Sequence, residues 1–142
     1  MKRPKNKAYF KKTTPLLKRK YRQKTERQLL ILENDRIFRE IIRKRDVVCQ
    51  KTGKARNLQV AHYFTRGNLR TRWDEDNACL MNAGAHLYWA HTEIEQFRDW
   101  WIKRLGIKRF EQLKLRAGYI SSYPTHEIKA MKERLKERLS EL

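Results

Sequence analysis

The chain has 142 residues, a length that favours one domain with an appended arm, because a core rarely divides in two below about 200 residues. Its 35 lysines and arginines against 16 acids give a formal charge of +19, so we expect a polyanionic partner, namely nucleic acid. It contains no run of about 18 apolar residues and no signal-peptide pattern, which argues against a membrane protein and favours a cytoplasmic location.

The first 24 residues carry eleven lysines or arginines and no acid, and Pro4 and Pro15 interrupt any regular element. Such a segment cannot bury enough apolar surface to fold alone, so we predict a flexible basic arm. Its cations would contact DNA phosphates; a solvated tail and a nuclear localisation signal are the alternatives. The arm residues that we expect on DNA are Lys11, Lys12, Lys18, Arg19 and Lys20.

Residues 25–45 repeat apolar side chains at helical intervals, as at Leu30, Ile37 and Ile41, and predict an amphipathic helix with its apolar stripe in the core. Residues 47–81 change to short β-prone pieces, at 47–49 and 58–64, separated by turn residues. This texture predicts a hairpin or a pair of short strands with long loops.

Helical spacing resumes after Asn82 and predicts one helix that ends at Gly106, followed by a shorter helix over 108–117. After a loop at 118–124, Thr125 is expected to cap a last amphipathic helix, whose apolar stripe could pack on the domain or on a second copy. We therefore predict an α+β fold with a basic arm at 1–24, a central domain at 25–117 and a C-terminal helix within 118–142.

Three polar residues suggest chemistry on a phosphodiester, whose hydrolysis needs a base, a cation that neutralises phosphate charge and a group that holds the base. His62 ends a strand-like segment, Asn77 follows fifteen residues later in a loop, and His86 opens a helix nine residues further on. This order is typical of the ββα-metal (His-Me finger) fold, in which a hairpin and a helix bind one divalent ion.

The segment from Ala61 to Asn77, which ends in Arg-Trp-Asp-Glu-Asp-Asn, resembles the core of the phage NinG (Rap) recombination proteins, a branch of the HNH superfamily. The resemblance covers about residues 35–117. It implies a DNA endonuclease acting on branched recombination intermediates, such as Holliday junctions and D-loops, in the host cytoplasm if the chain is phage-encoded. It also implies products with 5′ phosphate and 3′ hydroxyl ends.

The sequence departs from this family where two Cys-x-x-Cys knuckles would bind structural zinc. The corresponding positions are Cys49 and Thr52 in the first knuckle, and Asn82 and Ala85 in the second. Because one thiolate of four remains, we expect no structural zinc, with aromatic packing in its place. The residues available for that packing are Trp89, Phe97, Trp100, Trp101 and Phe110. The other cysteine, Cys79, is expected to be a buried apolar side chain.

The resemblance assigns His62 as the base, Asn77 as its orienting group and His86 as the metal ligand. In a regular α-helix His91 would point away from His86, and Ala61 replaces an acid that often precedes the base. With so few protein ligands, substrate and water would complete the shell, so we expect Mg²⁺ or Mn²⁺.

Three arginines, Arg66, Arg70 and Arg72, lie in the loop between His62 and Asn77 and are predicted to bind phosphates; solvated loop charge is the alternative. Asp74 and Asp76 are reserve metal ligands, although pairing with these arginines is their commoner role.

We therefore predict a metal-dependent HNH endodeoxyribonuclease, and a homodimer would suit a symmetric junction. A non-catalytic DNA-binding protein, a sequence-specific HNH endonuclease and an RNA-binding ribosome-associated protein are the alternatives.

Overall fold

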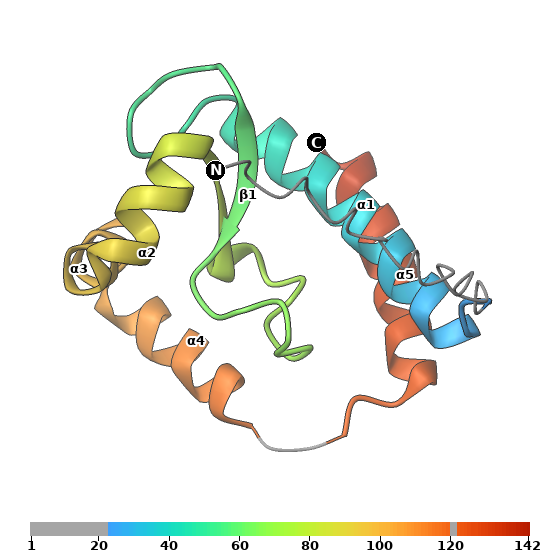
Figure 1. Cartoon of the computed structure of the whole chain (residues 1–142). Helices are drawn as coiled ribbons and strands as arrows, with labels where there is room; N and C mark the ends of the chain where they lie inside the picture. Colours follow the sequence, from blue (N-terminus) through green and yellow to red (C-terminus); the bar gives the residue numbers. More distant parts are fainter. Residues whose placement is uncertain (1–22, 120–121) are drawn as a thin grey trace, which may run out of the picture.

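The computed structural model describes residues 23–119 and 122–142 and has a mixed α+β fold, mostly helical with one two-stranded antiparallel sheet (Figure 1). The expected fold class is confirmed at this level. The predicted basic arm, with Lys11, Lys12, Lys18, Arg19 and Lys20, lies outside the described residues except for its last two positions. None of the helices in the two described ranges has the length and apolarity needed to cross a bilayer.

Helix α1 (Glu26–Asp46) confirms the predicted amphipathic helix. It begins in a capping box: the Thr25 side chain accepts a hydrogen bond from the Gln28 N–H, and the Gln28 side chain accepts one from the Thr25 N–H. The helix ends at Asp46, and its C-cap residue, Val47, has a φ of 60°. Residues 47–49, predicted as a strand, therefore form the turn that leaves α1.

The sheet consists of β1 (Leu58–His62) and β2 (Ala78–Asn82), with Leu58 opposite Asn82 and His62 opposite Ala78. The strand expected within 58–64 is confirmed, but its partner is β2 and not residues 47–49. A short 3₁₀ helix, η1 (Glu75–Asn77), precedes β2. The position of β2 was not predicted, although its first four residues form a continuous apolar run, which is typical of a strand buried on both faces.

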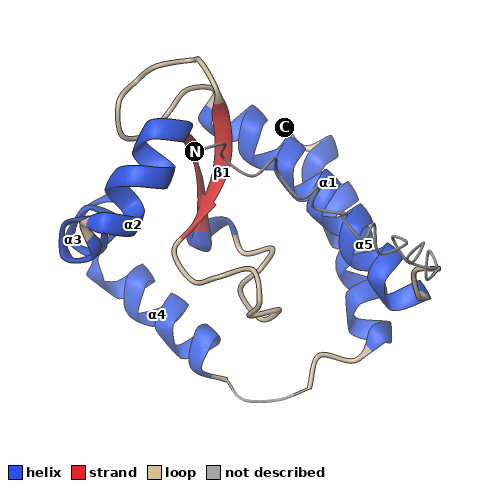
Figure 2. Cartoon of the chain, in the orientation of Figure 1, coloured by secondary structure: helices blue, strands red, loops and turns tan. Residues whose placement is uncertain are grey.

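Successive residues of β2 face two different cores, because side chains alternate across a strand. Ala78 and Leu80 pack with α1 and with α5 (Thr125–Ser140), whereas Cys79 and Met81 pack with the helices that follow β2. The sheet thus lies between two groups of helices (Figure 2).

Helix α5 lies alongside α1 (Figure 1) and buries Ile128 and Leu135. The Asn34 side chain of α1 donates a 2.9 Å hydrogen bond to the Ile128 carbonyl. The sequence allowed the apolar stripe of this helix to pack on the domain or on a second copy, and in the structure it packs on the domain. The predicted cap at Thr125 is wrong: Pro124 occupies the N-cap position, and no side chain caps the helix.

The single helix predicted between Asn82 and Gly106 is three pieces: a π-helical turn η2 (Ala85–Trp89), a short α2 (Ala90–Thr92) and α3 (Ile94–Leu105). The break between α2 and α3 falls at Glu93, whose φ of −107° and ψ of 61° are not helical. Gly106, with a φ of 81°, ends α3 as predicted, and α4 (Ile107–Gly118) matches the helix expected at 108–117.

Candidate functional site

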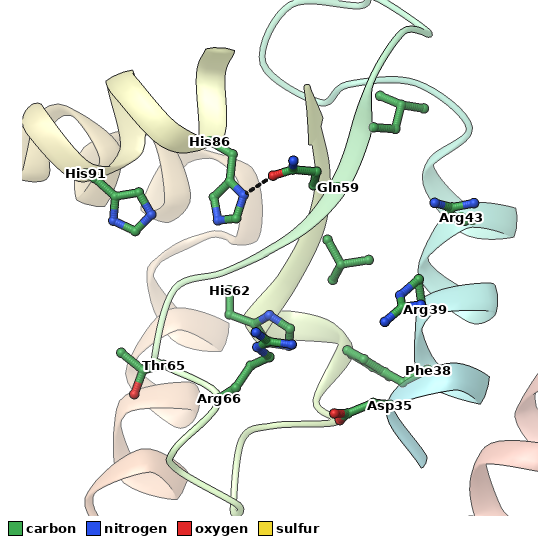
Figure 3. A pocket seen from close by; sticks show the side chains of 12 residues that line it. Asp35, Phe38, Arg39, Arg43, Gln59, His62, Thr65, Arg66, His86 and His91 are labelled. Atoms are coloured by element: carbon green, nitrogen blue, oxygen red, sulfur yellow. Dashed lines mark hydrogen bonds between the residues drawn. The ribbon is translucent and has the colours of Figure 1, made fainter. Parts of the chain in front are cut away.

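A pocket of about 570 Å³ lies between α1, β1, the loop after β1 and the η2–α2 segment (Figure 3). Its lining includes two of the three predicted site residues, His62 and His86, together with His91. The remaining lining residues are Asp35, Phe38, Arg39, Arg43, Leu58, Gln59, Val60, Thr65 and Arg66. The predicted histidines are therefore brought to one pocket, although they lie 24 positions apart in the chain.

His62 stands at the end of β1 with its Nε2 atom 3.0 Å from the carbonyl oxygen of Arg72. A carbonyl only accepts, so Nε2 carries the proton and Nδ1 keeps the lone pair of the neutral ring. Burial lowers the pKa of His62 to about 4; the Arg72 carbonyl acts against this shift, and the charge of Arg66 adds to it. The imidazole is therefore neutral at pH 7, the form that can accept a proton.

Asn77 is fully buried and does not line the pocket; it secures the loop that follows His62. Its Oδ1 accepts from the Phe64 N–H at 2.7 Å, and its Nδ2 donates to the carbonyls of Phe64 at 3.0 Å and Thr71 at 2.8 Å. The Tyr63 N–H also donates to the Asn77 carbonyl at 3.0 Å. Asn77 thus joins both ends of the loop whose Arg72 carbonyl contacts His62.

His86 lies on η2 and faces Gln59 of β1 (Figure 3). Its Nδ1 atom is 2.9 Å from the Gln59 carboxamide oxygen, which can only accept, so Nδ1 carries the proton and Nε2 keeps its lone pair. A histidine that binds a metal usually donates its other ring N–H in this way. Burial lowers the pKa of His86, and the charges of His91 and Arg66 lower it further. Gln59 was not singled out in the sequence, where nothing distinguishes it from any polar strand residue.

The expectation that His91 points away from His86 is wrong. The ring centroids of the two histidines are 5.4 Å apart, and both side chains line the pocket. The cause is the π-helical turn, in which the Ala90 N–H donates to the Ala85 carbonyl five residues earlier, so residues five apart share a side. No local sequence signal predicts such a turn.

The three predicted loop arginines have different surroundings. Arg66 is exposed and lines the pocket. Arg72 instead binds both carboxylate oxygens of Asp35, at 2.6 and 2.8 Å, and Arg70 pairs with Glu127 at 3.3 Å and donates to the Ser122 carbonyl. Burial favours the neutral form of Asp35, but the bonds from Arg72 and Trp73 outweigh it and lower its pKa. Of the three, Arg66 is the one whose side chain the fold leaves available at the pocket.

Asp74 and Asp76 do not pair with the loop arginines, as their commoner role had suggested, and neither lines the pocket. Both bind Arg116 of α4, at 2.6 and 3.2 Å, and Asp76 also contacts Arg109. These ion pairs fasten the η1 region to α4.

The four positions that would form the zinc knuckles come together between the turn after α1 and the end of β2. The Thr52 N–H donates to Cys49 Sγ at 3.4 Å, and the Asn82 side chain donates to Thr52 Oγ1 at 3.0 Å. The Asn82 Oδ1 accepts from the Ala85 N–H at 2.8 Å. One thiol, a hydroxyl, a carboxamide and a methyl group do not make a tetrahedral zinc site, so the residues do not fit this metal.

Packing accompanies these hydrogen bonds, because Cys49 lies in the core that contains Phe97, Trp101 and Phe110, with Trp89 and Trp100 packed against it. Cys79 is fully buried in the same core, and burial raises the pKa of its thiol to about 12, as expected for an inert apolar side chain.

A divalent cation at the pocket would have to be held by imidazoles together with substrate and water. Within residues 23–119 and 122–142, no group of three or more His, Cys, Asp or Glu side chains is placed to hold a metal ion. Two imidazoles with ring centres 5.4 Å apart can share one ion, since each binds through one nitrogen at about 2 Å. The spacing of His86 and His91 is therefore compatible with a shared cation.

Comparison with known proteins gives no assignment: no family model, no curated protein and no solved structure matches the chain. The likeness to the NinG proteins therefore remains an inference from the residues.

Proposed function

We propose that this protein is a metal-dependent DNA endonuclease of the HNH (His-Me finger) type, acting on branched recombination intermediates. The observation that carries the proposal is the meeting of His62, His86 and His91 in one pocket that also holds three arginine side chains. The order of elements supports it, since β1 and β2 form an antiparallel pair and the next helical segment bears His86. In this proposal, these elements are the ββα-metal unit.

The chain's own residues would divide the chemistry as follows. His62, neutral and held through Nε2 by the Arg72 carbonyl, accepts a proton from the attacking water at Nδ1. Asn77 fixes the loop that carries this carbonyl, and Arg66 binds a phosphate oxygen. A cation at His86 and His91 would supply positive charge to the phosphate and to the leaving 3′ oxygen.

The donor set refines the expectation about the metal. The acid that lines the pocket, Asp35, is bound by Arg72, so imidazole nitrogens are the protein ligands on offer. Nitrogen ligands suit Mn²⁺ better than Mg²⁺, which prefers oxygen. We therefore expect both ions to support cleavage, with Mn²⁺ the more effective.

A panel of substrates and metals tests the function. The purified chain is incubated with labelled Holliday junction, D-loop, linear duplex, single strand and RNA, each with Mn²⁺, Mg²⁺ or EDTA. Metal-dependent nicking of the branched DNA, leaving 5′ phosphate ends and absent in EDTA, is the expected result. Cutting of one particular linear duplex would instead indicate a sequence-specific HNH endonuclease.

The chief rival is a DNA-binding protein without catalysis, which the engaged Asp35 and the altered knuckle positions favour. It predicts tight binding in the same panel with no nicking under any metal. A preference for RNA together with indifference to metal would point to a ribosome-associated protein.

A further inference from the structure

The arginines of the described ranges differ in whether they bind a carboxylate, and those that line the pocket do not. Most of those near the cores bind carboxylates: Arg45, Arg70, Arg72, Arg104, Arg109, Arg116 and Arg138. Arg39, Arg43 and Arg66 line the pocket, and no carboxylate between residues 23–119 or 122–142 pairs with them. The charge of Arg66 also acts on Asp35, whereas Arg39 and Arg43 are not among the groups that shift the pKa of that carboxyl. Guanidinium groups gathered around one hollow favour the entry of an anion.

The buried face of α1 fixes how the helix is turned about its own axis. This orientation places Arg39 and Arg43 at the pocket. Phe38, Ile41 and Ile42 are buried against β2 and α5, and the two exposed arginines lie beside them. Four residues make about one helical turn, so Arg39 and Arg43 project from the same side of α1, roughly 6 Å apart along its axis. Figure 3 shows both on the α1 side of β1, with His86 and His91 on the other side.

The negative charge of the pocket is already neutralised inside the protein. Asp35 accepts two bonds from Arg72 and one from Trp73 at 2.9 Å, so it does not compensate Arg39 or Arg43. Leu58 and Val60 also line the pocket, with the polar Gln59 between them in β1. Guanidinium groups bind phosphate oxygens through paired N–H groups.

From this arrangement we infer that Arg39 and Arg43 bind backbone phosphates of the polynucleotide strand that the pocket histidines face. Helix α1 then forms one wall of the nucleic-acid groove, and the η2–α2 segment forms the other. The inference rests on the proposed function and extends it, since neither arginine stood out in the sequence from the other charges of an amphipathic helix.

Binding measured without metal tests this assignment independently of cleavage. Fluorescence anisotropy with a labelled four-way junction, in EDTA and over a range of salt concentrations, compares the unaltered chain with R39Q/R43Q. The matched control is R36Q/K44Q, which removes the same charge from exposed positions of α1 outside the pocket. Circular dichroism checks that both variants keep the helical content of the unaltered chain.

The pocket variant should bind at least tenfold more weakly. Its plot of log affinity against log salt should be shallower by about 1.8, the value for two lost phosphate contacts, whereas the control changes by less than half as much. Equal losses in the two double variants, or no binding of any polynucleotide by the unaltered chain, would overturn the inference. If only R39Q/R43Q loses affinity and the metal panel shows no nicking, the phosphate contacts are upheld and the nuclease is rejected. If the metal panel shows nicking but both double variants lose affinity equally, the nuclease is upheld and the phosphate contacts are rejected.

Discussion

Replacing His62 with alanine is expected to lower the rate of DNA cleavage by 10²- to 10⁴-fold, on the order of what a positioned general base contributes. The imidazole is the group that the Arg72 carbonyl holds in a defined tautomer at the pocket, and burial keeps it neutral. DNA affinity should stay within about twofold, because His62 carries no charge to lose at pH 7. Single-turnover cleavage and anisotropy on the same preparation measure the two quantities.

The matched control for this variant is His126→Ala, which removes an exposed histidine from α5, outside the pocket. This change should leave both rate and affinity unaltered. Loss of cleavage in His62→Ala alone, when both variants are prepared in the same way, would exclude a contaminating nuclease as the source of cleavage. If His62→Ala cuts at the rate of the unaltered chain, the assignment of the base is wrong. If both variants are inactive, loss of a histidine as such does not identify the site.

Replacing Asn77 with alanine should lower the free energy of unfolding by about 3 to 5 kcal/mol, because one buried N–H and two carbonyls lose their partner together. The loop after His62 would also lose the hydrogen bonds that Asn77 makes to it, so the Arg72 carbonyl would no longer hold the imidazole. The rate of cleavage should therefore decrease by a larger factor than the fraction of folded protein does. Urea unfolding and cleavage per folded molecule are the measurements.

Asn34→Ala provides the control, since Asn34 is equally buried but lies in the contact between α1 and α5. It loses one hydrogen bond, and its Oδ1 has no partner in the described structure, so a smaller destabilisation of about 1 kcal/mol is expected. Cleavage per folded molecule should not change. An Asn77→Ala variant that unfolds like Asn34→Ala and cleaves normally would show that the loop does not depend on Asn77.

Helix α1 was predictable because a single apolar stripe recurs along it. The sheet was harder to predict, because β2 is buried on both faces and therefore lacks the alternation of apolar and polar residues that identifies a strand. The cap of α5 was misassigned because Thr125 has the preferred residue type, whereas Pro124 takes the position. Such details depend on the chain that precedes the helix.

The candidate site was predicted through residue order and spacing, which identified His62 and His86 as residues of one pocket. Residue order does not reveal that a π-helical turn brings His91 to the pocket, because in a regular α-helix a residue five positions after His86 faces another side. Nor could it assign ion pairs between distant segments, such as Arg72 with Asp35 and Arg116 with Asp74. These pairs decide which cations remain available for phosphate.

Titration with Mn²⁺ tests most directly whether the pocket histidines surround one cation. The chain has four histidines, and in protein labelled with ¹⁵N at histidine each ring can be followed by NMR while the paramagnetic ion is added. We predict that the signals of His86 and His91 broaden first, followed by that of His62, while His126 on α5 stays sharp at substoichiometric ion. Equal broadening of all four, or loss of the His126 signal ahead of the pocket histidines, would contradict the account.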